Sequence, residues 1–337
     1  MGKRFYIYFL CVLLAFVAIV FSACGGSDNS ASGDNGGENL GSQVGNIIGN
    51  ITGSSKGTIK DDPNAPVRDD TPRVLANSAD GALTIDGNGA TIDYSNASDG
   101  YIMAKYEGDN TRIKLQITKD GGSTYTYDVA PGTDFAAFPL TDGSGNYNVA
   151  MFLNIEGDKY SQACAGTVQS DITDEFSPFL RPNQYCNFTD ATQAVAKSAE
   201  VAQGAKSDLK VIESVFLFVT SNVVYDYDKA ANVQSGYIPD VDETLSTGKG
   251  ICFDYASLTS CMLRSQGIPC KLVVGYAGDA YHAWISVYVD GTGWVANMIQ
   301  FDADKWTLMD PTFAASGDRA DPNLVGNGQN YNPVYFY

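Results

Sequence analysis

The hydrophobic pattern of this chain changes its period once, at residues 189–190, and this change limits the folds that the chain can adopt. Between residues 75 and 188, short runs alternate apolar and polar side chains, as Ile-Lys-Leu-Gln-Ile does at 113–117. Turn signals such as Asp-Gly-Gly at 120–122 separate the runs. Several short strands of period two, each followed by a turn, are typical of an antiparallel β-sandwich, so residues 75–188 are predicted to form one.

Residues 189–337 instead predict helices followed by strands. Residues 190–204 are rich in Ala, Gln, Lys and Glu, and residues 209–219 place apolar side chains at helical spacing. A third helix, two strands and two extensions of the sheet are expected at residues 251–265, 270–276, 282–289, 294–295 and 306–310. The predicted fold class is therefore α+β, in which helices pack on an antiparallel sheet in the part that follows the sandwich.

The chain holds a single histidine, His282, within the tripeptide His-Ala-Trp. Cys252 lies upstream in Gly-Ile-Cys-Phe-Asp-Tyr-Ala, and Asp310 lies downstream in Met-Asp-Pro-Thr. A nucleophile, a base and a carboxylate in this order supply the parts of acyl transfer through a thioester. Cys252 is predicted at the N-terminus of a helix, where unpaired N–H groups and the helix dipole stabilise a thiolate.

The block at residues 222–313 resembles the core of the transglutaminase-like superfamily, which has a papain-like arrangement of Cys, His and Asp. The motifs that carry the resemblance follow one another in family order: Gly-Ile-Cys-Phe-Asp-Tyr-Ala, Gly-Ile-Pro, Gly-Tyr, His-Ala-Trp and Asp-Pro-Thr. The resemblance implies Cys252 as the nucleophile, His282 as the base and Asp310 as the carboxylate that orients the imidazole.

The identity of the carboxylate stays open in the sequence. The interval from His282 to Asp310 is longer than the resemblance implies, and it contains Asp302 and Asp304 as alternatives. No metal or other cofactor is expected, because one histidine and scattered Asp residues lack ligand spacing. The chain also has no EF-hand loop and no Gly-rich phosphate loop after a strand.

The N-terminus predicts a bacterial lipoprotein signal peptide at residues 1–23. A basic Met-Gly-Lys-Arg start precedes an apolar run at residues 5–21, and Ser-Ala-Cys follows. Cleavage before Cys24 would leave that cysteine as a lipidated N-terminus. The alternative is a plain membrane anchor, since the apolar run is close to the roughly 17 residues that a span needs. In either case the rest of the chain is expected outside the membrane.

Residues 24–74 are predicted to be a flexible linker. Gly, Ser, Asn and Asp dominate its first part, and such a segment buries too little apolar area to offset its ordering entropy. A flexible linker of about 50 residues has a root-mean-square reach on the order of 40 Å. We therefore expect an extracytoplasmic protein that is lipid-anchored to the bacterial cell membrane and stands away from the lipid surface.

The seven cysteines fall into separate groups. One leaves with the signal segment, Cys24 would carry lipid, and Cys252 must stay free as the nucleophile. The remaining even number in an oxidising compartment suggests disulfides. The pairing Cys164–Cys186 and Cys261–Cys270 is favoured because each pair falls within one predicted domain, and four buried free thiols are the alternative.

These patterns together predict a lipid-anchored, transglutaminase-like thiol enzyme that acts on protein or peptide amide bonds and passes the acyl group to an amine or to water. The N–H group of Cys252 would help to hold the oxyanion, with Tyr225 and Tyr227 as candidates for a second donor. The expected partners are a protein or peptide substrate, with cell-wall peptide as one candidate, and the membrane through the lipid. The alternatives are a cysteine peptidase or amidase of the cell envelope and a non-catalytic surface binding protein.

A net charge of −18 and a pI near 4.2 exclude two classes of partner. An acidic surface repels the phosphates of nucleic acids, so no nucleic-acid partner is expected. It equally repels an anionic membrane surface. Membrane association is therefore expected through the N-terminal lipid, or through the plain anchor that is its alternative, and not through surface charge.

Overall fold

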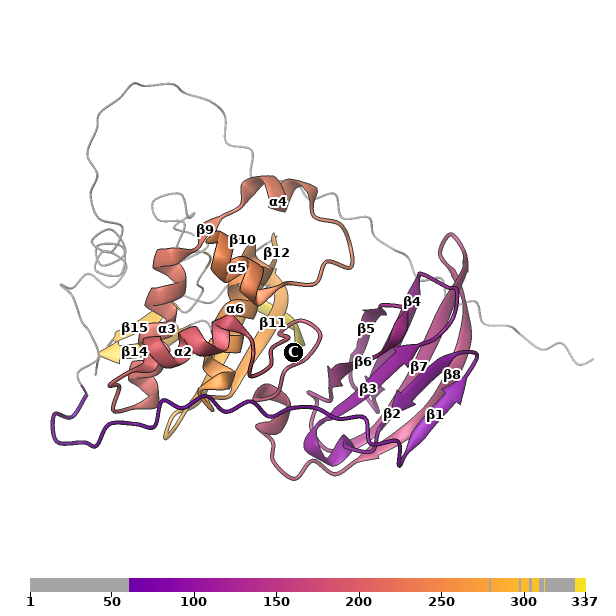
Figure 1. The fold of residues 1–337 in the computed structure, drawn as a ribbon, viewed down its shortest axis with the longest axis horizontal. Coiled ribbons are helices and arrows are strands. Elements are labelled where there is room, and N and C mark those ends of the chain that lie inside the picture. The colour runs from indigo at the N-terminus through magenta and orange to yellow at the C-terminus, as the bar shows by residue number, and fades with distance from the viewer. Residues whose placement is uncertain (1–60, 279, 297, 303–304, 309–311, 313–330) are drawn as a thin grey trace, which may run out of the picture.

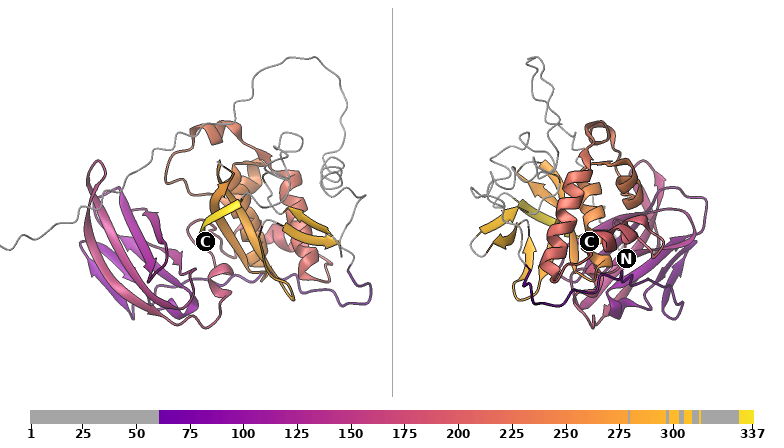
Figure 2. Two further views of the ribbon diagram at one scale, coloured as in Figure 1. Left: turned by 180° about the vertical axis from the view of Figure 1, so that it is seen from behind. Right: turned by 60° about the vertical axis from the view of Figure 1, so that its left-hand side comes forward.

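The computed structural model describes residues 61–337, except 279, 297, 303–304, 309–311 and 313–330. The predicted signal peptide, Cys24, most of the predicted linker and Asp310 lie outside the described residues. Within the described part of the chain, no helix combines the length and the apolar character needed to cross a membrane. The strands before residue 171 and the helices after residue 192 form two regions that lie side by side along the longest axis (Figures 1 and 2).

The N-terminal region consists of two antiparallel four-stranded sheets. The first has the order β1 (Thr84–Gly87), β2 (Ala90–Asp93), β3 (Tyr101–Tyr106) and β6 (Gly132–Pro139). The second has the order β5 (Thr124–Val129), β4 (Ile113–Lys119), β7 (Gly145–Glu156) and β8 (Lys159–Ser170). The expected antiparallel strands are present, and the description of these sheets as a β-sandwich stays a prediction.

Period-two alternation explains why these strands form. On β4, Ile113, Leu115 and Ile117 are buried and the residues between them are not. Gly87 lets β1 approach β8 closely, because a Cβ atom there would lie 2.5 Å from the carbonyl oxygen of Ala163. The buried faces of the strands thus supply the core of this region.

The C-terminal region packs helices on an antiparallel sheet of order β13-β12-β11-β16. The strands are β11 (Cys270–Ala277), β12 (Ala280–Val289), β13 (Gly293–Ala296) and β16 (Tyr331–Phe336). The helices are α2 (Gln193–Ala202), α3 (Asp208–Asn222), α4 (Tyr227–Asn232), α5 (Val241–Thr247) and α6 (Cys252–Ser265). The helices and strands expected between residues 190 and 289 are thus present, whereas the short helices α4 and α5 are additional.

The sequence predicts that residues 294–295 and 306–310 extend the sheet. Residues 294–295 do so in β13, but two other pairings differ from the expectation. Strand β15 (Lys305–Leu308) pairs with β14 (Met298–Asp302) in a separate hairpin, and β16 takes the edge beside β11. Gly275 makes the β11–β16 approach possible, because a Cβ atom there would lie 2.2 Å from the carbonyl oxygen of Asn332. Only a residue without a side chain fits at this position.

Helix α6 lies at the centre of the C-terminal region and contacts β11, β12, α2, α3 and α5. All of its residues from Asp254 to Ser265 are buried. The buried guanidinium of Arg264 donates hydrogen bonds to the carbonyl oxygens of Cys270 (2.9 Å), Arg181 (2.8 Å) and Tyr337 (2.6 Å). One cation therefore ties this helix to the sheet and to the segment that arrives from the N-terminal strands.

Aromatic side chains join the two regions. The ring of Tyr127 on β5 stacks on Tyr185 at 5.7 Å and meets the edge of Tyr337 at 5.8 Å. Tyr125 packs against Tyr335 at 5.3 Å between ring centroids. Buried residues of both regions form one continuous hydrophobic core, although the sequence pattern changes between them.

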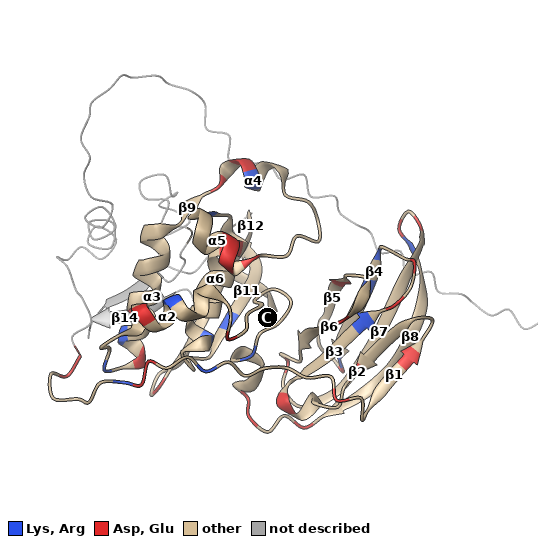
Figure 3. Cartoon of the chain, in the orientation of Figure 1, with Lys and Arg blue, Asp and Glu red and all other residues tan. Residues whose placement is uncertain are grey.

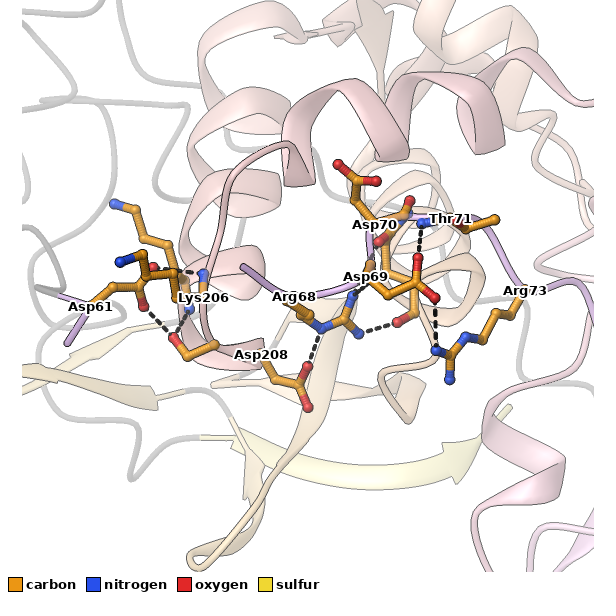
Figure 4. A network of polar contacts seen from close by, with 11 residues as sticks. Asp61, Arg68, Asp69, Asp70, Thr71, Arg73, Lys206 and Asp208 are labelled. Carbon is orange, nitrogen blue, oxygen red and sulfur yellow. Dashed lines mark hydrogen bonds and ion pairs between the residues drawn. The ribbon is translucent and has the colours of Figure 1, made fainter. Parts of the chain in front are cut away.

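The described end of the predicted linker makes specific contacts, which Figure 4 shows. The carboxylate of Asp61 accepts from the Ser207 hydroxyl (2.6 Å) and from a backbone N–H of the α2–α3 loop, and Arg68 pairs with Asp208 at 2.5 Å. The N–H of Arg73 donates to the carbonyl oxygen of Ser265 at 2.7 Å. Residues 61–73, here called the strap, thus lie against the C-terminal region before the chain enters β1. A polar composition does not reveal such contacts, because they use charges and backbone groups instead of apolar area.

Candidate active site

Cys252 is the first residue of α6, as the sequence predicts. Ile251 precedes the helix in an extended conformation, with φ −95° and ψ 177°. The thiol is half-buried at the end of a helix that is otherwise enclosed. N–H groups in the first helical turn have no partner within the helix and favour an anion, which suits a thiolate or an oxyanion. Gly250 is required here, because a Cβ atom would lie 2.6 Å from that of Asp254.

His282 lies on β12 opposite Gly275 of β11. It is buried, with 7% of its surface exposed, and its ring stacks on Trp284 at 6.1 Å between centroids. The ring of Tyr331 on β16 lies 6.4 Å away. Because α6 packs directly on β12, the helix that begins with Cys252 and the strand that carries His282 are neighbours. The fold therefore brings together the elements that carry the predicted nucleophile and base.

The predicted carboxylate, Asp310, lies outside the described residues, and so does the alternative Asp304. Asp302 ends β14, the first strand of the separate hairpin. Thr312, from the same Asp-Pro-Thr motif as Asp310, is buried. The role of Asp310 stays a prediction.

Tyr281 is a neighbour of Cys252 that the motifs do not indicate. Its ring lies 5.5 Å from that of Tyr276, and 43% of its surface is exposed. Burial of its hydroxyl raises the pKa of Tyr281 to about 12, and the negative charges of Tyr335, Tyr276 and Cys252 add to this effect. At neutral pH the residue is thus a protonated phenol beside the nucleophile. Its position next to His282 in a strand is the signal that could have found it.

The two tyrosines considered as oxyanion donors occupy different positions. Tyr225 lies on β9 (Val224–Tyr225), which pairs in parallel with β10 (Lys249–Gly250) immediately before Cys252. Tyr227 begins α4 and is 55% exposed. Their ring centroids are 5.0 Å apart. Tyr225 pairs with Gly250, two residues before the nucleophile, and is the nearer of the two along this pairing. The donor role of either tyrosine stays a prediction.

The structure contradicts the favoured disulfide pairing. Cys164, Cys186, Cys261 and Cys270 are buried free thiols, which is the alternative that the sequence left open. Cys186 packs on α6, where its thiol donates to the carbonyl oxygen of Ser257 at 3.6 Å, whereas Cys164 lies on β8. The thiol of Cys270 contacts the Ser260 hydroxyl at 3.4 Å instead of Cys261. Sequence proximity within a predicted domain does not set the geometry that a disulfide needs.

Burial makes these thiols poor nucleophiles. It raises the pKa of Cys186 to about 11 and that of Cys270 to about 12, in both cases against the opposing charge of Arg264. Burial also raises the pKa of Cys261 well above its usual range. Cys252 is the one half-buried thiol among the five cysteines that the structure describes. Among the described residues, no group of three or more His, Cys, Asp or Glu side chains could hold a metal ion.

Several known proteins are similar to parts of this chain. Residues 195–298 match the model of the transglutaminase-like superfamily. The chain is 27% identical over 239 residues to a UPF0252 protein of Methanocaldococcus jannaschii, covering 65% of this chain and 66% of that protein. It is 26% identical over 143 residues to the kyphoscoliosis peptidase of Mus musculus, covering 35% of this chain and 22% of that peptidase.

Two solved structures are also similar to this chain. A candidate cysteine protease of Cytophaga hutchinsonii aligns with a TM-score of 0.37 at 14% identity. The alignment covers 76% of this chain and 78% of the protease chain. Red sea bream transglutaminase aligns with a TM-score of 0.26 at 13% identity and covers 65% of this chain and 48% of its own. The chain thus spans less than half of that transglutaminase.

Proposed function

We propose that this protein is a thiol enzyme that acts on protein or peptide amide bonds through a thioester at Cys252. The observation that carries the proposal is the contrast among the thiols: Cys252 is half-buried at a helix N-terminus, whereas the other described cysteines are buried. Nucleophilic cysteines occur in positions where a helix start stabilises the thiolate. The match of residues 195–298 to the transglutaminase-like superfamily supports the same chemistry.

In the proposed mechanism, His282 accepts the thiol proton as the sulfur of Cys252 attacks the amide carbonyl carbon. The N–H groups at the start of α6 hold the oxyanion. When the carbon–nitrogen bond breaks, the leaving amine or ammonia takes the proton from His282. Asp310 would orient the imidazole and stabilise its cation. A primary amine or water then attacks the thioester carbon and gives a proton to His282; the carbon–sulfur bond breaks, and the Cys252 thiolate takes that proton back.

A peptidase or amidase is the second candidate within the same chemistry. Part of this chain is similar to the kyphoscoliosis peptidases, which favours hydrolysis. Hydrolysis fits the same site, since it differs from amine transfer only in the second nucleophile. We further propose that the protein is extracytoplasmic and lipid-anchored at Cys24 to a bacterial cell membrane, with protein or peptide, including cell-wall peptide, as substrate. The support for this placement is the basic, apolar and Ser-Ala-Cys sequence of residues 1–24.

The test is to incubate the full chain with casein and a fluorescent primary amine, and in parallel without the amine. Fluorescent casein indicates acyl transfer, and new casein peptides, or glutamate formed from casein glutamine, indicate hydrolysis. Iodoacetamide followed by peptide mapping identifies the reactive thiol, with Cys252→Ala as the control. Absence of both products, together with Cys252 alkylated no faster than Cys164, would favour the non-catalytic binding protein instead.

A further inference from the structure

Asp254 is a fully buried carboxylate in the first turn of α6, two residues after Cys252. Its Oδ2 accepts from the N–H of Ile251 at 2.8 Å and from the ammonium of Lys229 at 2.8 Å. Its Oδ1 accepts from the hydroxyl of Tyr237 at 2.5 Å. A buried charge is costly unless it is paired and hydrogen-bonded, and both oxygens of Asp254 meet that condition. The proposed mechanism does not use this group.

Two of these partners come from one segment that apolar packing does not fix. Helix α4 carries Lys229 and buries none of its residues. Tyr237 follows in the loop before α5, and its ring centroid lies 4.5 Å from the Lys229 ammonium. Burial raises the pKa of Tyr237 and its hydrogen bond to Asp254 raises it further, so the phenol stays protonated and donates. The position of this segment therefore depends on polar contacts, of which those with Asp254 are the buried ones.

Residues 226–237 also begin beside the nucleophile. The N–H of Asp226 donates to the carbonyl oxygen of Gly250 at 2.9 Å, two residues before Cys252. The segment then returns through Tyr237 to Asp254, two residues after Cys252. The two ends of the segment thus contact residues just before and just after the proposed nucleophile.

The segment lines a shallow hollow of about 460 Å³ that is open to solvent and is bordered by Lys229 and residues 232–237. Asn232, Gln234 and Ser235 offer neutral hydrogen-bonding groups, and Gly236 adds backbone without a side chain. These are groups that can bind the amides of an extended peptide. Acidic residues at the starts of α4 and α5, the two helices on either side of this loop in the sequence, are red in Figure 3, and their charge favours a neutral or basic peptide over an acidic one.

We infer, on the basis of the proposed function, that Asp254 is a positioning residue for the reaction at Cys252. Through Lys229 and Tyr237 it holds residues 226–237 as the wall against which a neutral or basic acyl-donor peptide lies. Asp254 touches neither the substrate nor the reacting atoms. It is expected to act on substrate binding more than on the chemistry of the thiol.

The experiment compares the full chain with Tyr237→Phe and Lys229→Met variants. The probe is benzyloxycarbonyl-Gln-Gly, with a fluorescent primary amine as acceptor. Loss of one hydrogen bond to a charged group is expected to raise KM for the dipeptide about tenfold, whereas kcat changes less than about twofold. The rate at which iodoacetamide alkylates Cys252 should stay unchanged. Lys229→Arg should restore most of the KM, and Lys249→Met, a nearby exposed lysine on β10, should leave KM unchanged.

Hydrogen–deuterium exchange of residues 226–237 gives a readout that does not need activity. Faster exchange in Tyr237→Phe together with the higher KM supports the inference. Unchanged exchange refutes the positioning role even if the wild-type chain shows no turnover, so failure of the proposed function is distinguishable. Faster exchange with unchanged KM shows that the segment is not the donor wall. Equal losses in kcat and in alkylation rate, with KM constant, show that Asp254 supports only the helix start.

Discussion

Strand β4 in the N-terminal region and helix α6 in the C-terminal region are both central to their layers, but they bury different kinds of side chain. On β4, Ile113, Leu115 and Ile117 are buried and the residues between them are not. On α6, burial is continuous and includes the charged groups of Asp254 and Arg264. An alternating strand needs only apolar partners, whereas a helix enclosed on all sides must pair its buried polar groups within the fold. The polar contacts of α6 therefore fix the helix against specific partners, whereas β4 needs only apolar neighbours.

The largest expected difference between the regions is in activity. Cys252→Ala should abolish turnover, with a loss on the order of 10⁶-fold in kcat as for other essential nucleophiles, because no other described thiol is exposed to substrate. Thermal unfolding should change little, since the side chain is half-buried. The matched change Cys164→Ala on β8 should leave turnover intact. Activity that survives Cys252→Ala would move the nucleophile elsewhere.

The next difference concerns stability. Arg264→Met should destabilise the protein by about 4 kcal/mol in urea unfolding, because it removes the guanidinium donor from carbonyl oxygens on three segments, although the Tyr337 oxygen keeps the N–H of Leu272. Lys114→Met on β4 removes an ion pair with Asp128 that is partly exposed, and should cost less than about 1 kcal/mol. Similar costs for the two variants would mean that α6 is no more dependent on polar contacts than β4.

The contact between the two regions should weaken at high pH. Burial raises the pKa of Tyr125 to about 12 from an ordinary value of 10.0. The unfolded chain then loses this proton first, so the stability from Tyr125 is complete below pH 10 and is lost as pH rises towards 12. From this group alone the loss at pH 11 is about 1 kcal/mol. Urea unfolding at pH 8 and pH 11 should show that Tyr125→Phe loses less than the wild type; equal losses would exclude this tyrosine as a cause.

The smallest expected effect lies in the strap. Arg68→Ala removes a pair with Asp208 and a hydrogen bond to the carbonyl oxygen of Gln266, and should cost about 1 kcal/mol. Arg73→Ala breaks an ion pair with Asp69 in which both side chains are more than half exposed, and should change stability by less than about 0.5 kcal/mol. Urea titrations of both variants test the difference. A larger cost for Arg73→Ala would show that the Arg73 side chain holds the strap more firmly than the Arg68 charge does.

The parts of the molecule that could be predicted from the sequence are those with a local signal. The alternation at 113–117, the helix that starts at Cys252 and the strand that carries His282 all have periodic or motif signals in consecutive residues. The edge strand β16 has no such signal, because its place beside β11 depends on the close approach of Gly275 to its register partner Pro333, which is far away in the sequence.

The free thiols and the Asp254 contacts were also beyond local reasoning. The Cys186 thiol donates to the carbonyl oxygen of Ser257, and Asp254 pairs with Lys229 from a helix that buries none of its residues and with Tyr237 from the loop that follows it. Such partners are set by tertiary packing, so spacing along the chain does not predict them. Tyr281 is an intermediate case: its position next to His282 in a strand is a local signal, whereas its proximity to Cys252 depends on how α6 packs on β12.

The strap also determines how the molecule would bear a mechanical load. Tension applied through the chain before residue 61 reaches the turn between α2 and α3 first, through Asp61 and Ser207, and not the strand β1. The hydrogen bonds of Asp61, Arg68 and Arg73 must shear before any pull is transmitted to the N-terminal sheets. A force applied at that end would therefore act on the helices that surround α6 before it acts on the N-terminal sheets.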